Sequence, residues 1–160
     1  PGKPTVTKAI RMVLKLLGSA AINGPFSREL FATQQQVFRQ LANHQSSAET
    51  VNFNTSFTIV STLSDIGFYV RPFHHTITHK EELQLISMNR SARQVAALLP
   101  RMWRAKALEG KGIVSLVGKG LEVDYECPQR YTIDGDLYTS EHTQRFSVGP
   151  AIEFIIGTKQ

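Results

Sequence analysis

The chain has 160 residues, of which 41% are hydrophobic and 19% charged, and its net charge is +5. This composition excludes a disordered chain, and a domain of this length can bury a core without disulfides or metals. The single cysteine, Cys127, excludes an intramolecular disulfide and cysteine-rich zinc sites, and it favours a reducing compartment. We expect neither a signal peptide nor a membrane span, because the apolar runs are too short.

Helical periodicity predicts three helices. In the first, over residues 6–17, apolar side chains recur at helical spacing on one face. The second is predicted over residues 27–44, with Ser27 as its N-cap. Its apolar stripe comprises Leu30, Phe31, Val37, Phe38 and Leu41. The third begins at Ser91, where Gln94 completes a capping-box pattern, and Pro100 is expected to kink or break it.

Shorter apolar segments predict strands. Residues 51–63 are expected to hold two of them. The strands after Gly112 are separated by turns too short for crossover helices, so they should pair antiparallel. The remaining predicted strands are residues 68–70, 83–88, 113–117, 131–133, 144–148 and 152–156.

Residues 121–127 show the clearest alternation. Apolar residues at 121, 123, 125 and 127 alternate with Glu122, Asp124 and Glu126, which is typical of a half-buried strand with its acidic side chains in water. Together these segments predict an α+β fold: a mainly antiparallel, sandwich-like sheet with about three helices, in a single domain over residues 1–160.

The segment from Tyr131 to Tyr138 places Asp134 and Gly135 between apolar runs, and Asp-Gly in that setting is a strong hairpin signal. A carboxylate at such a turn points away from both strands and can reach a ligand. It could then accept the proton of a hydroxyl group that attacks phosphorus. The pattern predicts the hairpin, and from the pattern alone the chemistry stays open.

Several segments follow one another in a recognisable order: Leu83-Gln84-Leu85-Ile86, Leu98-Leu99-Pro100-Arg101, the basic stretch 104–111, the strand 121–125, and Asp134-Gly135-Asp136. In this order and spacing, residues 57–154 resemble the C-terminal domain of the diacylglycerol kinase family of lipid kinases. The resemblance implies that Asp134 is the general base for the lipid hydroxyl and that Gly135 allows the turn. It implies that Asp136 helps to arrange metal and phosphate.

The chain departs from the family pattern in two places. Asp136 stands where the family usually has Glu, so the carboxylate reaches about one methylene less far. The family often carries acidic residues associated with a structural Mg²⁺ before the Leu-x-Leu strand, whereas this chain reads His79-Lys80-Glu81-Glu82. Because Mg²⁺ prefers oxygen ligands and a lysine repels it, we expect that site to be absent or altered.

The family's N-terminal domain carries a glycine-rich nucleotide loop, and nothing in this sequence resembles it. Gly112 and Gly118 do not form a phosphate loop, because five residues separate them and that segment is a predicted strand. We therefore expect the nucleotide-binding domain to be absent from this chain and the chain alone to be inactive.

His74, His75 and His79 form a local cluster. Imidazoles bind Zn²⁺ or Ni²⁺, but the pattern is a weak metal signal without a placed carboxylate. The alternative is that these histidines flank a strand at the surface. We accordingly expect no metal ligands here.

Basic residues could form a surface for anionic lipid headgroups. Lys8, Arg11 and Lys15 share one face of the first predicted helix, and Arg101 and Arg104 follow the Leu-Leu-Pro motif. The alternative is that the helix packs on the core and these charges are solvated. Nucleic-acid binding has only the net charge in its favour and is not expected.

The resemblance implies that the parent protein is an ATP- and Mg²⁺-dependent kinase of diacylglycerol or a related lipid. It would be cytoplasmic and peripherally bound to the membrane. This chain would supply the lipid side, and the N-terminal domain of the same parent would hold ATP. The alternative is a non-catalytic lipid- or partner-binding module that retains the fold. A homodimer stays open, because edge strands could pair between copies.

Overall fold

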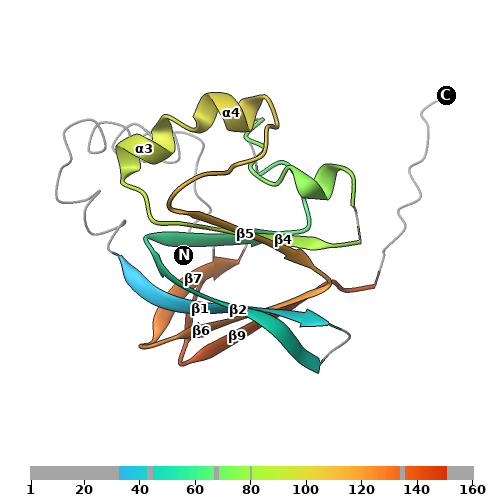
Figure 1. The fold of residues 1–160 in the computed structure, drawn as a ribbon, viewed down its shortest axis with the longest axis vertical. Helices are drawn as coiled ribbons and strands as arrows, with labels where there is room; N and C mark the ends of the chain where they lie inside the picture. Colours follow the sequence, from blue (N-terminus) through green and yellow to red (C-terminus); the bar gives the residue numbers. More distant parts are fainter. Residues whose placement is uncertain (1–32, 43–44, 67–68, 80, 134–135, 151–160) are drawn as a thin grey trace.

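A computed structural model describes residues 33–42, 45–66, 69–79, 81–133 and 136–150. These residues form three layers: short helical segments, a three-stranded sheet and a four-stranded sheet (Figure 1). The predicted first helix, residues 6–17, and the predicted last strand, residues 152–156, lie outside the described residues.

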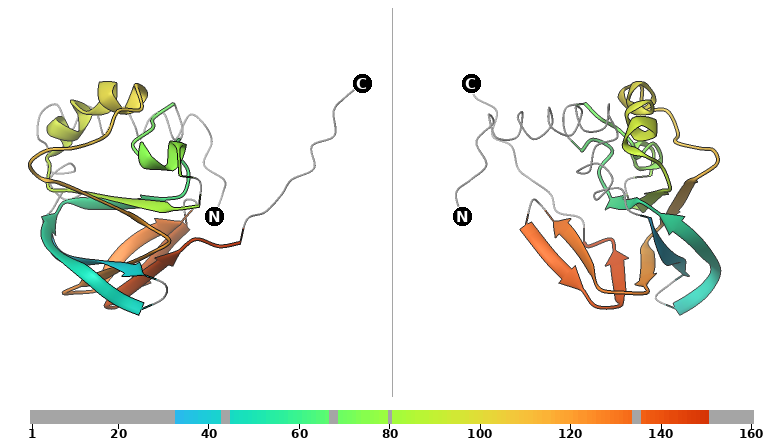
Figure 2. Two further views of the ribbon diagram at one scale, coloured as in Figure 1. Left: turned by 45° about the vertical axis from the view of Figure 1, so that its right-hand side comes forward. Right: turned by 90° about the vertical axis from the view of Figure 1, so that its left-hand side faces the viewer.

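Each sheet in the described part of the chain is antiparallel throughout, as predicted. The strand orders are β2-β1-β6-β9, β3-β4-β5 and β7-β8. The strands are β1 (Gln34–Ala42), β2 (Gln45–Thr55), β3 (Phe57–Ser61), β4 (Leu83–Met88), β5 (Ile113–Gly118), β6 (Gly120–Tyr125), β7 (Gln129–Ile133), β8 (Asp136–Ser140) and β9 (Thr143–Ser147). The β7–β8 pair lies beside β9, away from β2 (Figure 2, right).

Helical structure in the described ranges is limited to three short segments: the 3₁₀ turn η1 (His75–Ile77), α3 (Ala92–Ala96) and α4 (Leu99–Trp103). The capping box at Ser91 is confirmed, since Gln94 Oε1 accepts a hydrogen bond of 2.9 Å from the Ser91 backbone N–H. Pro100 interrupts the predicted third helix, and α4 starts beside it because the first turn of a helix tolerates a proline.

The predicted helix over residues 27–44 is wrong where the structure describes it. Residues 34–42 form strand β1, which pairs with β2 on one side and β6 on the other. In the strand, Gln36 and Phe38 alternate with exposed or half-buried neighbours, and Phe38 is fully buried. Hydrogen bonding to β2, the next strand in the chain, and to the distant β6 thus overrides the local helical spacing. The prediction of about three helices is therefore not borne out. Tyr69 and Val70, the described part of the predicted strand 68–70, do not lie in a strand.

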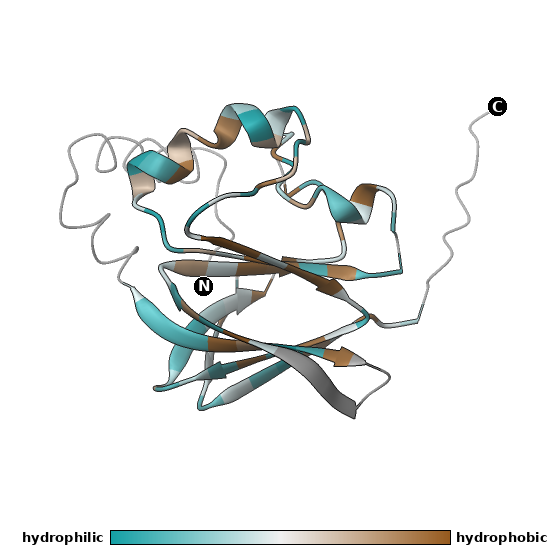
Figure 3. Ribbon diagram, viewed as in Figure 1, coloured by the Kyte–Doolittle hydropathy of each residue, from teal (hydrophilic) through white to brown (hydrophobic). Residues whose placement is uncertain are grey.

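The core consists of two apolar clusters, one on each face of the three-stranded sheet. Strand β4 lies in the centre and all six of its residues are buried. Leu83 and Leu85 face the four-stranded sheet, whereas Ile86 and Met88 face the helical layer. Figure 3 shows the hydrophobic residues concentrated on this strand and its neighbours. This packing gives the sandwich-like arrangement that the sequence predicts.

The chain passes between the two sheets at two tight corners. At the first, the Ser56 N–H donates to the Met88 carbonyl at 2.7 Å, so β2 continues into β3. At the second, β5 and β6 are joined at Lys119, between the buried Gly118 and Gly120. A Cβ atom on Gly120 would lie 3.2 Å from Leu41 Cβ, so β1 would have to shift by a few tenths of an ångström to accept a larger residue here.

We predict that Leu85→Ala lowers the free energy of unfolding by about 2–5 kcal/mol, because it opens a cavity in the core. Leu85 is 0% exposed. The matched control is Leu63→Ala, because Leu63 is 68% exposed and the same truncation there should change stability by less than about 0.5 kcal/mol. Urea unfolding of both variants checks the prediction, and equal losses would contradict the described layering.

Candidate functional site

The Tyr131–Tyr138 segment forms the predicted hairpin. Strands β7 and β8 pair from Gln129↔Ser140 to Ile133↔Asp136, which leaves residues 134 and 135 as their connection. Asp136 is the first residue of β8 and is exposed. Asp134 and Gly135, the predicted base and turn residue, lie outside the described residues. The hairpin prediction is confirmed, and the catalytic roles stay predictions.

The hairpin exposes large apolar side chains. Ile133 is 54% exposed and Leu137 is 75% exposed, on opposite faces of the two strands. Tyr131 and Tyr138 stack across the strands with ring centroids 5.5 Å apart. In the described ranges, the β7–β8 sheet has no third strand. A two-stranded ribbon is marginally stable alone, so its attachment to the rest of the fold matters.

Tyr125 attaches the base of the hairpin to the four-stranded sheet. Its backbone N–H donates to the His142 carbonyl at 2.8 Å, and its hydroxyl donates to Gln144 Oε1 at 2.5 Å. Burial, with the nearby Tyr131, raises the pKa of Tyr125 to about 12, so the hydroxyl stays a hydrogen-bond donor at neutral pH. Both connections of the hairpin, to β6 and to β9, are thereby held together.

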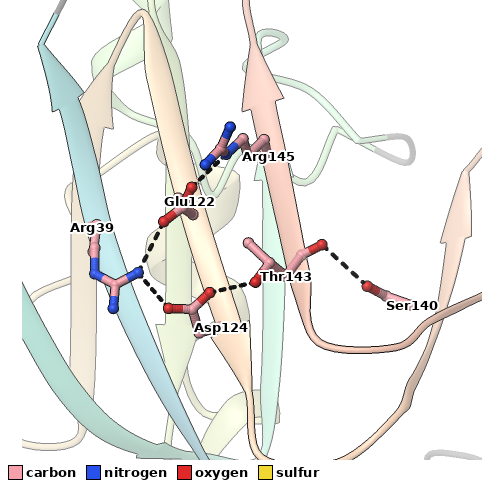
Figure 4. Close-up of polar contacts among 6 residues, drawn as sticks. All are labelled: Arg39, Glu122, Asp124, Ser140, Thr143 and Arg145. Carbon is pink, nitrogen blue, oxygen red and sulfur yellow. Dashed lines mark hydrogen bonds and ion pairs between the residues drawn. The ribbon is translucent and has the colours of Figure 1, made fainter. Parts of the chain in front are cut away.

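A ladder of charged side chains crosses the outer face of the same sheet. Arg39, Glu122 and Arg145 occupy directly opposed positions on β1, β6 and β9. Glu122 accepts hydrogen bonds from Arg39 Nη1 at 2.9 Å and from Arg145 Nε at 2.5 Å (Figure 4). Cross-strand neighbours of opposite charge stabilise a sheet, and here one carboxylate serves two guanidinium groups.

Glu122 is only 4% exposed, so the prediction that it lies in water is wrong. Its apolar–polar alternation correctly predicts the strand, but Arg39 and Arg145 cover the polar face. The hydrogen bond from Arg145 and then that from Arg39 hold the pKa of Glu122 below its ordinary value of 4.5, against the opposing effect of burial. Glu122 therefore stays ionised in the folded protein at neutral pH.

Asp124 continues the ladder toward the hairpin. It pairs with Arg39 and accepts a hydrogen bond of 2.7 Å from the Thr143 hydroxyl. The carbonyl of Thr143 in turn accepts from the Ser140 hydroxyl at 3.5 Å, at the end of β8 (Figure 4). The ladder thus links the centre of the sheet to the base of the hairpin.

The basic residues predicted for membrane contact fall into two groups. Arg101 and Arg104 are exposed at α4, next to the exposed Trp103, and Arg101 donates to the Ala107 carbonyl at 3.1 Å. Lys8, Arg11 and Lys15 lie outside the described residues. Among the described helices, none is long and apolar enough to cross a bilayer.

In the structure, the carboxylate of Glu82 lies beside the histidine cluster, a grouping that was not predicted from the sequence. The rings of His75 and His79 stack on each other, and Glu82 Oε2 lies within hydrogen-bond distance of His75 Nε2, at 2.9 Å. The spacing of residues 75, 79 and 82 is a signal that could have indicated this grouping. His74 points elsewhere, with Nδ1 2.7 Å from the Ala105 carbonyl oxygen. The segment between Gly112 and Gly118 was predicted to be a strand and not a phosphate loop, and this is confirmed, because residues 113–118 form β5.

Neither protein-family models nor curated protein sequences match this chain. Its fold is similar to a solved structure of a putative diacylglycerol kinase from Bacillus anthracis str. Sterne, with a TM-score of 0.51 and 8% identity, covering 82% of this chain and 42% of that one. A second structure, a diacylglycerol kinase from the same organism, gives a TM-score of 0.44 and 9% identity over 77% and 43% of the two chains.

The first of these similarities shows that the chain has the fold of part of a diacylglycerol kinase-like protein. The resemblance that the order of segments predicted is confirmed at the level of fold. The chain spans less than half the length of the first of these solved proteins. Activity, substrate and partners do not follow from fold alone.

We predict that Glu122→Gln lowers stability at neutral pH and flattens its dependence on pH. The folded-state pKa of Glu122 is below its ordinary value, so the ionised form contributes stability above pH 4.5 that is lost as pH falls through the folded pKa. The gap in urea midpoint between wild type and variant should therefore narrow in acid. Glu109→Gln, at an exposed position, is the control, and a gap that stays constant with pH would contradict the account.

Proposed function

We propose that this chain is the lipid-side domain of an ATP-dependent kinase that phosphorylates the hydroxyl group of diacylglycerol or a related lipid. The observation that carries the proposal is the fold similarity to a putative diacylglycerol kinase over 82% of the chain. The order of sequence segments that ends at Asp134-Gly135-Asp136 also supports it. So does the β7–β8 hairpin, because its two strands lie on either side of residues 134 and 135 in the sequence.

In the proposed reaction, Asp134 acts as the general base. The lipid hydroxyl oxygen attacks the γ-phosphorus of ATP, the bond to the bridging oxygen breaks, and ADP leaves. The hydroxyl proton passes to the Asp134 carboxylate. Phosphoryl transfer depends mainly on positioning and on charge stabilisation, so a carboxylate on an anchored hairpin suits this role. Asp136 would orient the phosphate side of the reaction.

ATP and Mg²⁺ would be held by the N-terminal nucleotide-binding domain of the same parent. In this chain, the glycines that resemble a phosphate loop flank strand β5, where they cannot wrap a phosphate. The metal-binding group of described residues offers two imidazoles and one carboxylate, which does not suit Mg²⁺ with its preference for oxygen ligands. We therefore propose that the chain is inactive alone.

The exposed hairpin would meet the nucleotide-binding domain. Ile133, Leu137 and Tyr138 expose apolar surface at the end of the hairpin where residues 134 and 135 connect the strands. Such side chains are typical of surfaces that a partner covers. Contact between domains at this point would bring Asp134 to the nucleotide.

Membrane approach is the remaining part of the proposal, because a lipid acceptor lies in a bilayer. Arg101 and Arg104 could contact anionic headgroups, with Trp103 at the interface. The described residues place these three side chains on one short segment at α4. The parent would then be a peripheral membrane protein of the cytoplasm.

We predict that Asp134→Asn lowers phosphate transfer by a factor of about 100 or more, because the amide cannot accept the proton. The assay measures labelled phosphate transferred from ATP to a panel of lipids by the longest natural form that contains this chain. Asp136→Asn should cause a smaller loss, and Glu109→Gln, an exposed carboxylate elsewhere, should cause none.

Two results would overturn the proposal. Full activity of Asp134→Asn would show that the turn is only structural. Lipid binding without phosphate transfer, in the wild-type protein, would favour the non-catalytic binding module.

We further predict that the double variant Arg101→Gln/Arg104→Gln binds anionic vesicles about 30-fold more weakly, since each basic residue near such a surface contributes about 1 kcal/mol. Arg130→Gln, an exposed arginine on β7, is the matched single-charge control. Sedimentation with phosphatidylserine vesicles measures the partition coefficients. Unchanged binding by the double variant, or an equal loss in the control, would exclude α4 as the membrane surface.

A further inference from the structure

The turn that leads into β4 brings together three side chains that commonly bind metals. His75, His79 and Glu82 each offer a ligand atom, and these atoms lie within 4.8 Å of one another. None of the three has a part in the proposed phosphate transfer. The three ligands are spaced by four and then three residues along the chain.

Backbone hydrogen bonds fix the path of this turn. The N–H of His79 donates to the His75 carbonyl at 3.1 Å, and the N–H of Glu82 donates to the His79 carbonyl at 3.3 Å. The first bond spans four residues, as in one turn of α-helix, so the side chains of His75 and His79 point to the same side.

Gln84 anchors the turn to the sheet. This buried side chain, 6% exposed, accepts a hydrogen bond of 3.0 Å from the His75 N–H through Oε1. Its Nε2 donates to Ser115 Oγ on β5 at 2.8 Å. The buried Thr76 donates to the Phe73 carbonyl at 3.0 Å and holds the adjoining residues. The backbone that carries His75 is therefore held by the core, whereas the ligand side chains reach the surface.

The side chains lie close enough to share an ion once the imidazole rings turn, because the nitrogen lone pairs of two stacked rings run parallel and do not meet at one point. The rings of His75 and His79 are nearly parallel, with an interplanar angle of 8° and centroids 4.2 Å apart. His75 Nε2 lies 2.9 Å from Glu82 Oε2. Zinc–ligand bonds of about 2.0–2.1 Å in a tetrahedron separate the ligand atoms by roughly 3.4 Å. The ligand atoms lie within 4.8 Å of one another, so the widest separation would have to shrink by up to about 1.4 Å. Rotation of partly exposed side chains supplies such a movement.

We propose that His75, His79 and Glu82 form a binding site for Zn²⁺, with the fourth position open to water. Two imidazoles and one carboxylate are a donor set that zinc accepts with an open position, and imidazole favours a transition metal over Mg²⁺ or Ca²⁺. The ion would join the 3₁₀ turn to the start of β4. Because the folded turn holds the ligands close together, zinc would bind the folded chain in preference to the unfolded one and stabilise it.

The test uses the chain without an affinity tag, since a histidine tag would itself bind zinc. Calorimetric titration with ZnCl₂ should show one ion per chain, and zinc should raise the thermal midpoint while EDTA reverses the rise. X-ray absorption of the complex should show two imidazoles and oxygen ligands around the metal.

Two ligand variants and two matched controls decide the assignment. His79→Ala and Glu82→Gln should each weaken zinc binding at least about tenfold and abolish the thermal shift. His142→Ala and Glu81→Gln change the same residue types at exposed positions outside the ligand set and should bind zinc as the wild type does. His79 is exposed, so its variant retains the fold and keeps the test decisive. Absence of one-to-one binding, or equal binding by all four variants, would overturn the proposal.

Discussion

The burial of strand β4 on both faces is the constraint on which the rest of the structure depends. Leu83 and Leu85 enter the core between the two sheets, while Ile86 and Met88 enter the core beneath the helices. Neither core can be exposed without disturbing the other, because one six-residue strand serves both. Gln84, on the same strand, fixes the turn that carries the proposed zinc ligands.

The opposite side of the molecule combines a rigid base with an exposed end. Glu122 and its two arginines join β1, β6 and β9, and Tyr125 ties the hairpin to this sheet. Beyond that base the hairpin presents exposed apolar side chains and Asp136. An anchored hairpin of this kind can hold a reacting group toward a second domain with little loss of conformational freedom, which is what positioning for phosphate transfer requires.

Sequence patterns correctly predicted features that depend on residues close together in the chain. The predictions were wrong where contacts between residues far apart in the chain determine the structure. Asp134-Gly135, the Ser91–Gln94 capping box and the apolar run at 83–88 are local signals, and the hairpin, α3 and β4 follow from them. Residues 34–42 carry helical spacing, yet pairing with the adjoining β2 and with the distant β6 makes them strand β1. Glu122 meets Arg39 across 83 residues of sequence, a contact that alternation within one strand cannot reveal.

The proposed lipid kinase activity is tested most directly by identifying the phosphorylated product without choosing the lipid in advance. The longest natural form containing this chain is incubated with ATP and a total lipid extract, and the lipids are compared by mass spectrometry. The account predicts a phosphorylated glycerolipid or related lipid that forms only with ATP and whose precursor declines in step. If ATP is consumed without any phosphorylated lipid, or no lipid changes, the chain shares the fold of a lipid kinase domain but not its chemistry.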